Sequence, residues 1–135
     1  QHDLFLHAHA DEDAISRIAD RAADLTVVWA HAGFDVAVAR LEQLLDRYPN
    51  VLLELSFRND IAPEGEITAE WRRFLTKHPD RFLVGMDTYI ASRWAQLNDL
   101  ADQARQWLAQ LPPDVADRIA FTNAAKLAHQ ATAAE

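Results

Sequence analysis

Residues 26–31 read TVVWAH, an apolar run rich in β-branched and aromatic side chains that ends in a histidine. This composition predicts a buried β-strand. Three more runs share the pattern, an apolar stretch that closes in a polar and chemically capable residue: DLFLH at 3–7, VLLELSFR at 51–58 and RFLVGMD at 81–87. Each run is followed by a segment with helical periodicity, so a strand–helix order repeats along the chain.

The segments after these runs carry apolar residues at helical spacing, and Trp71, Trp94 and Trp107 within them are interpreted as packing residues. Strands that are joined by helices run parallel, and right-handed crossovers build an open sheet or part of a barrel. We therefore predict an α/β fold of parallel βα repeats in a single domain, residues 1–135. It is either an open sheet or, since four units are half of the eight that a closed barrel needs, half of a TIM (β/α)8 barrel. The expected helices span 11–23, 34–48, 67–77, 92–111, 114–118 and 123–133.

The composition is that of an ordinary globular protein and argues against several classes. The 135 residues are 50% hydrophobic and 25% charged, with a net charge of -8 and no basic stripe, so no nucleic-acid partner is expected. Cysteine is absent, which excludes disulfides and thiolate zinc sites and fits a cytoplasmic protein. No apolar run approaches the roughly 20 residues that span a membrane. The chain starts at Gln1 with a strand almost at once, which favours a fragment or a processed chain.

Polar residues end all four predicted strands, and parallel strands bring their carboxyl ends to one rim, where α/β proteins bind ligands. His7, His31 and Asp87 are therefore expected to converge. Two imidazoles and a carboxylate suit a divalent metal ion, most simply zinc, and a metal-bound water becomes a nucleophile near neutral pH. Each residue also has a plainer interpretation: a polar strand end for His7, a hydrogen-bonded core histidine for His31, and a helix cap or arginine partner for Asp87.

The third predicted strand carries three polar residues in alternation, Glu54, Ser56 and Arg58. Alternating side chains point to one face of a strand. If that face lines the site, these residues are substrate contacts, and Arg58 is the best candidate for a carboxylate or phosphate group. Otherwise Glu54 pairs with a helix, and Leu53, Leu55 and Phe57 form the core face.

These stretches resemble the carboxyl-terminal half of the amidohydrolase superfamily, most closely its amidohydrolase-2 branch of metal-dependent (β/α)8-barrel enzymes. The segment LFLHA at 4–8 resembles the fifth strand of that family, and VVWAHAG at 27–33 resembles the sixth strand. DRFLVGMD at 80–87 resembles the eighth strand, and IAFTNAAKL at 119–127 resembles the Asn-Ala helix that closes the barrel in this branch. The resemblance implies that His7 and Asp87 bind the metal and that Asp87 also accepts the proton of the attacking water. It implies that His31 is a further ligand, or a residue that polarises water and substrate, and that Glu54, Ser56 or Arg58 contacts substrate.

The resemblance implies a metal-dependent hydrolase that cleaves an ester, lactone or amide bond in a small-molecule substrate. The first strand of that family carries a His-x-His pair, which would precede Gln1; His7-Ala8-His9 imitates the spacing, but the fifth-strand assignment is favoured. Part of the metal site would then come from a missing amino-terminal half, and exposed strand edges also favour a homo-oligomer. Three alternatives stay open: a non-oxidative decarboxylase of the same branch, a non-catalytic half-barrel module, and an unrelated small α/β binding domain.

Overall fold

The computed structural model describes residues 4–132. Its elements, in chain order, are β1 (Phe5–Ala8), α1 (Glu12–Arg21), β2 (Thr26–Trp29), the 3-10 turn η1 (Ala30–Gly33), α2 (Val38–Arg47), β3 (Val51–Glu54), α3 (Ala69–Lys77), the 3-10 turn η2 (Pro79–Arg81), β4 (Phe82–Leu83), α4 (Ala91–Ala95), α5 (Leu97–Leu108), α6 (Pro113–Asp117), the π-helix η3 (Arg118–Thr122) and α7 (Asn123–Thr132).

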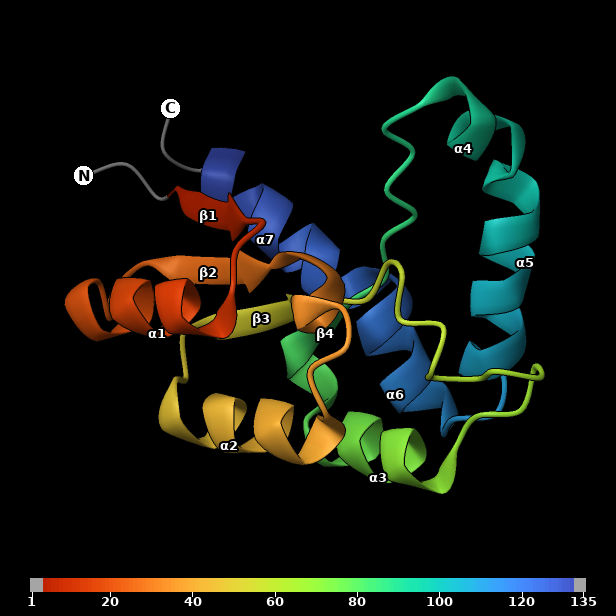
Figure 1. Ribbon diagram of the computed structural model, residues 1–135, viewed down its shortest axis with the longest axis horizontal. Helices are drawn as coiled ribbons and strands as arrows, with labels where there is room; N and C mark the ends of the chain where they lie inside the picture. Colours follow the sequence, from red (N-terminus) through yellow and green to blue (C-terminus); the bar gives the residue numbers. More distant parts are fainter. Residues whose placement is uncertain (1–3, 133–135) are drawn as a thin grey trace.

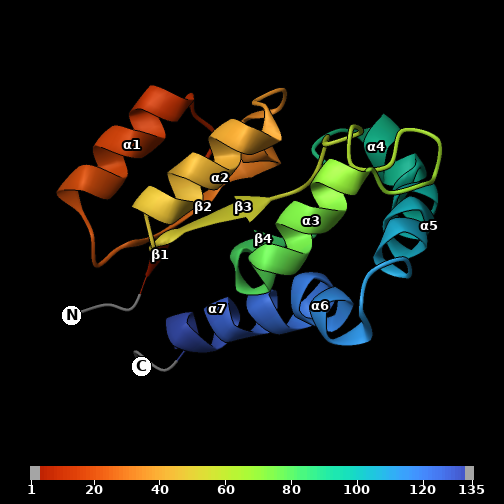
Figure 2. The same ribbon diagram turned by 90° about the horizontal axis from the view of Figure 1, so that it is seen from below.

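The four strands form one parallel sheet in the order β1-β2-β3-β4, which confirms the predicted α/β architecture. Helices α1, α2 and α3 cover one face of the sheet, and α6 and α7 lie on the opposite side (Figures 1 and 2). The order of the strands follows the order of the chain, as in consecutive units of a TIM barrel. β1 and β4 are the edge strands of this sheet.

The main hydrophobic core lies between the sheet and α1, α2 and α3. Trp29, Leu53 and Phe82 stand side by side on adjacent strands and are fully buried. They belong to one cluster with Trp71 and Phe74 of α3, and the rings of Phe74 and Phe82 meet edge to face at 4.9 Å. Burial of these large side chains supplies the hydrophobic stabilisation that fixes the strands against their helices.

The strands are shorter than the sequence predicts, and the difference matters for the site. β3 ends at Glu54 rather than continuing to Arg58, because β4 pairs with it only at Phe82 and Leu83. Beyond Glu54 the chain turns, and Phe57 adopts a left-handed conformation with φ of 63°. The strict alternation expected over 51–58 therefore stops before Arg58. Asp3 and residue 133, the predicted ends of a strand and a helix, lie outside the described residues.

The single helix expected over 92–111 is two helices, α4 and α5, which meet at Gln96. They stand away from the sheet on one side of the molecule (Figure 1). The packing role predicted for Trp94 is wrong, because this residue is 60% exposed, whereas Trp71 and Trp107 are buried as predicted. Within residues 4–132, none of the helices has the length and apolar character needed to cross a bilayer.

Asn123 fastens the carboxyl-terminal helices to the sheet. Its side-chain amide donates to the carbonyl oxygens of Pro79 and Phe82, both at 2.9 Å, and the residue is buried. Next to it, the backbone N–H of Val84 donates to Ile119 O. These bonds place α7 so that Leu127 packs against Val28 and Leu83.

Substitution of Asn123 by alanine removes the amide that donates to the buried Phe82 O and the partly buried Pro79 O. We expect the free energy of unfolding to fall by about 1–3 kcal/mol in chemical denaturation. Asn98→Ala, on the exposed surface of α5, is the matched control and should change stability by no more than about 0.5 kcal/mol. Equal stability of the two variants would contradict the fastening role.

Glu42 on α2 joins that helix to α3. Its carboxylate accepts hydrogen bonds from Arg73 at 2.9 and 3.0 Å and from Lys77 at 2.6 Å. The hydrogen bonds from Arg73 and then Lys77 lower the pKa of Glu42 from 4.5 to about 2. A carboxyl group with a lowered folded-state pKa stabilises the fold above its unfolded pKa and loses that contribution as pH falls.

Between pH 4.5 and about 2, the wild-type protein is therefore expected to lose unfolding free energy more steeply than Glu42→Gln. Urea unfolding at a series of pH values measures this slope. Glu64→Gln removes a carboxylate from an exposed loop away from α2 and α3 and serves as the control. Parallel stability profiles for wild type and Glu42→Gln would refute the assignment.

Candidate functional site

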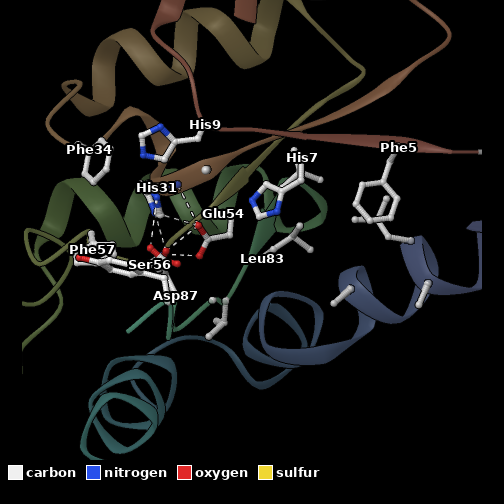
Figure 3. Close-up of a pocket in the computed structure, with 18 residues that line it drawn as sticks. Phe5, His7, His9, His31, Phe34, Glu54, Ser56, Phe57, Leu83 and Asp87 are labelled. Carbon is white, nitrogen blue, oxygen red and sulfur yellow. Dashed lines mark hydrogen bonds and ion pairs between the residues drawn. The ribbon is translucent and has the colours of Figure 1, made fainter. Parts of the chain in front are cut away.

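A cavity of about 850 Å³ lies at the carboxyl ends of the strands, between the sheet face that turns away from α1–α3 and helix α7 (Figure 3). Strand alternation explains part of its lining, because Phe5 and His7 of β1, Glu54 of β3 and Leu83 of β4 face this side. The loops after the strands supply the rest. The lining residues are Phe5, His7, His9, Val28, Ala30, His31, Phe34, Glu54, Ser56, Phe57, Leu83, Val84, Gly85, Asp87, Tyr89, Ala124, Leu127 and Ala128.

His31 lies just beyond β2, in a tight turn rather than at the strand end. His31, Ala32 and Gly33 all have left-handed backbone conformations, with φ of 59°, 43° and 70°. Gly33 is required here, since a Cβ atom would lie 2.5 Å from Trp29 Cζ2. The turn directs the imidazole of His31 into the cavity wall, where the residue is only 5% exposed.

The buried carboxylate of Glu54 organises the end of β2 and the turn after β3. It accepts hydrogen bonds from the backbone N–H of His31 at 3.0 Å, the backbone N–H of Ser56 at 2.6 Å and the Ser56 hydroxyl at 2.8 Å. Because that hydroxyl donates its only proton to Glu54, Ser56 Oγ must accept from His31 Nδ1, which lies 2.7 Å away. The network therefore holds neutral His31 in its Nδ1–H tautomer, with the Nε2 lone pair directed away from Ser56.

Asp87 faces that lone pair at the same wall of the cavity. It follows β4 in a left-handed conformation, with φ of 44°, and its side chain is 32% exposed. Asp87 Oδ2 lies 3.7 Å from His31 Nε2. In the neutral tautomer both atoms are acceptors, so the space between them favours a cation, a water or another donor.

The other two histidines of the site approach from β1 and the loop behind it. His7 lines the cavity, as the strand alternation requires, and is exposed. His9 packs its ring edge against the ring of His31, with centroids 5.1 Å apart. Within residues 4–132, no three His, Cys, Asp or Glu side chains are arranged to hold a metal ion.

The structure thus brings His31, Glu54, Ser56 and Asp87 together and places His7 in the same cavity, but it gives Arg58 another environment. The Arg58 guanidinium is 1% exposed and forms a bidentate ion pair with Asp60, at 2.7 and 2.8 Å. It also donates to the carbonyl oxygens of Ala32 and Val36. Burial opposes ionisation of Asp60, but hydrogen bonds from Arg58 and Trp71 lower its pKa. Arg58 borders a second cavity of about 500 Å³, which adjoins the first at Ser56, Phe57 and Gly85.

Sequence reasoning missed Phe34 and Phe57 as parts of the site. Their rings contact the His31 ring at centroid distances of 4.4 and 5.2 Å. Both residues have φ above 60°, and left-handed conformations at bulky residues have no signal in a single sequence. It also missed the role of Gly85, whose missing Cβ leaves room for the Glu54 carboxylate.

With this geometry established, comparison with known proteins identifies the family. The family model described as amidohydrolase matches residues 1–128. The chain belongs to the amidohydrolase family. No curated protein matches it.

Two solved structures share the fold of this amidohydrolase chain. One is an uncharacterized TIM-barrel protein from Bordetella bronchiseptica, with a TM-score of 0.69 and 24% identity over 89% of this chain. The other is an amidohydrolase from Burkholderia multivorans with bound zinc, with a TM-score of 0.56 and 19% identity over 90% of this chain. The chain spans 40% and 51% of these two proteins, so it corresponds to half of a barrel.

The hydrogen-bond network predicts a measurable tautomer. In imidazole ¹⁵N NMR spectra at a pH where His31 is neutral, we expect the Nδ1–H form to dominate in the wild-type protein. Ser56→Ala removes the acceptor of that proton and is expected to give a mixture of tautomers. Ser16→Ala on α1 is the control and should leave the His31 signals unchanged. A dominant Nε2–H form in the wild-type protein would contradict the network.

Proposed function

We propose that this chain forms the carboxyl-terminal half of a metal-dependent hydrolase that uses an activated water to cleave an ester, lactone or amide bond. The observation that carries the proposal is the opposition of His31 Nε2 and Asp87 Oδ2, two acceptors 3.7 Å apart at the wall of an apolar cavity. Membership of the amidohydrolase family and the zinc in one structural neighbour support it.

The donor types fit zinc, which binds imidazole nitrogen and carboxylate oxygen. His31 Nε2 and Asp87 would hold the ion from this chain, with His7 as the next candidate from the same cavity wall. The described residues do not preassemble three ligands. We propose that His31, Asp87 and His7 bind zinc weakly on their own, and that further donors from another part of the protein complete the site. When bound, the ion would supply a water that loses its proton near neutral pH.

The chain's own residues would then have separate roles. Asp87 is the proton acceptor for the attacking water, because its half-exposed carboxylate points at the cavity. Glu54 and Ser56 hold the His31 ring in one orientation and one tautomer, as partners of metal-binding histidines do. The apolar walls would exclude bulk water from a small-molecule substrate. Arg58 remains a candidate substrate contact only through the second cavity, which it borders.

Zinc binding tests the proposal directly. We expect the purified chain to take up Zn²⁺ in isothermal titration calorimetry, and His31→Ala and Asp87→Asn to weaken the affinity at least about tenfold. His7→Ala is expected to weaken it as well. Asp102→Asn, an exposed position on α5, is the matched control and should bind like the wild type.

Absence of zinc uptake by the wild-type chain would contradict the proposal and favour a non-catalytic half-barrel module. Equal affinity of the wild type, His31→Ala and Asp87→Asn would show that zinc binds elsewhere on the surface.

A further inference from the structure

Arg93 of α4 contacts the turn that carries the proposed proton acceptor, and it does so through the backbone carbonyl oxygens of that turn. Its Nη2 atom donates to Met86 O at 2.6 Å, and its Nε atom donates more weakly to Asp87 O at 3.4 Å. The Cζ atom of Arg93 also lies over the ring of Phe57, 4.1 Å from its centroid. One side chain therefore contacts the turns that follow both β3 and β4.

Both of these turns contain a residue in a conformation that side chains normally avoid. Phe57 has φ of 63° and Asp87 has φ of 44°. Such conformations are unfavourable for residues with side chains and persist only where the surroundings hold them. The contacts of Arg93 fall on these two residues and on the carbonyl directly before Asp87.

The two turns also carry the two halves of the site. Asp87 presents its carboxylate to His31 Nε2, while the Phe57 ring packs edge-on against the imidazole of His31 at 5.2 Å. A displacement of either turn would therefore change the distance between Asp87 and His31.

We infer that Arg93 is a positioning residue that holds the left-handed turns at Phe57 and Asp87 in register, so that Asp87 Oδ2 and His31 Nε2 face each other at the cavity wall. The inference rests on the proposed function for the meaning of that geometry. Helix α4, which stands away from the sheet, would then hold the proposed proton acceptor Asp87 in position (Figure 1). A guanidinium suits the task because its planar fork can bond two carbonyl oxygens and stack on an aromatic ring at once.

Hydrogen–deuterium exchange of the metal-free chain tests the coupling. In Arg93→Ala we expect exchange to become at least about tenfold faster both around Phe57 and over residues 86–89, because the support of both turns is lost. Phe57→Leu should loosen residues 86–89 as well, and Arg93→Lys should have an intermediate effect. Arg105→Ala, an exposed arginine on α5, is the matched control and should change neither segment.

Zinc affinity separates positioning from general stabilisation. We expect Arg93→Ala to bind zinc about 10- to 100-fold more weakly than the wild type, although Arg93 is not a ligand. Faster exchange with unchanged zinc affinity would overturn the inference, and so would exchange that is unchanged at either turn. If Arg93→Ala does not fold, Arg93→Lys and Phe57→Leu provide the same test.

The two proposals fail in different ways. A wild-type chain that takes up no zinc would contradict the proposed function, while the exchange data would still decide whether Arg93 couples the two turns.

Discussion

The arrangement of the site depends on one buried charge, the carboxylate of Glu54. Burying an ionised group is costly unless it is hydrogen-bonded, and here its oxygens accept two backbone N–H groups and a hydroxyl. One of these donors belongs to the turn after β2 and two belong to the turn after β3. The carboxylate thus fixes the relative position of the two turns, and through Ser56 it fixes the ring of His31. Any rearrangement of these turns would leave a buried charge or its donors unpaired.

Two glycines make this arrangement sterically possible. At Gly33 the space of a Cβ atom is filled by the indole of Trp29, so the turn that carries His31 packs directly on the core. At Gly85 that space is filled by Glu54, whose Cδ atom lies 2.7 Å from the position of a Cβ. Because Gly85, just after β4, has no side chain, the Glu54 carboxylate of β3 can approach its backbone closely. The glycine before Met86 and Asp87 is explained by this contact, since its own φ is not left-handed.

The sequence predicted the parts of the fold that depend on regular periodicity. β-branched runs located the strands, and the strand–helix order predicted a parallel sheet whose rim brings His31 and Asp87 into contact. The prediction failed where regular structure ends. Strand alternation predicted that Arg58 lies on the same face as Glu54 and Ser56. The strand ends before Arg58, however, and the Arg58 guanidinium pairs with Asp60 and lies over the ring of Trp71. The contacts of Phe34, Phe57 and Arg93 depend on left-handed residues, which local propensity does not reveal.

His7 differs from His31 and Asp87 in how the structure supports it, because it lies on the edge strand β1. In a closed barrel each strand end is held between two neighbours, but in the described residues β1 pairs only with β2, and its residues Phe5 and His7 are exposed. His31 and Asp87 are instead fixed by interactions from neighbouring turns. In a TIM barrel, one face of the sheet lines the interior of the barrel. In this chain helix α7 covers the face that carries Val28 and Leu83, because Leu127 packs against these two residues. Helix α7 thereby buries apolar side chains of this sheet face, and it closes one side of the cavity that holds the site.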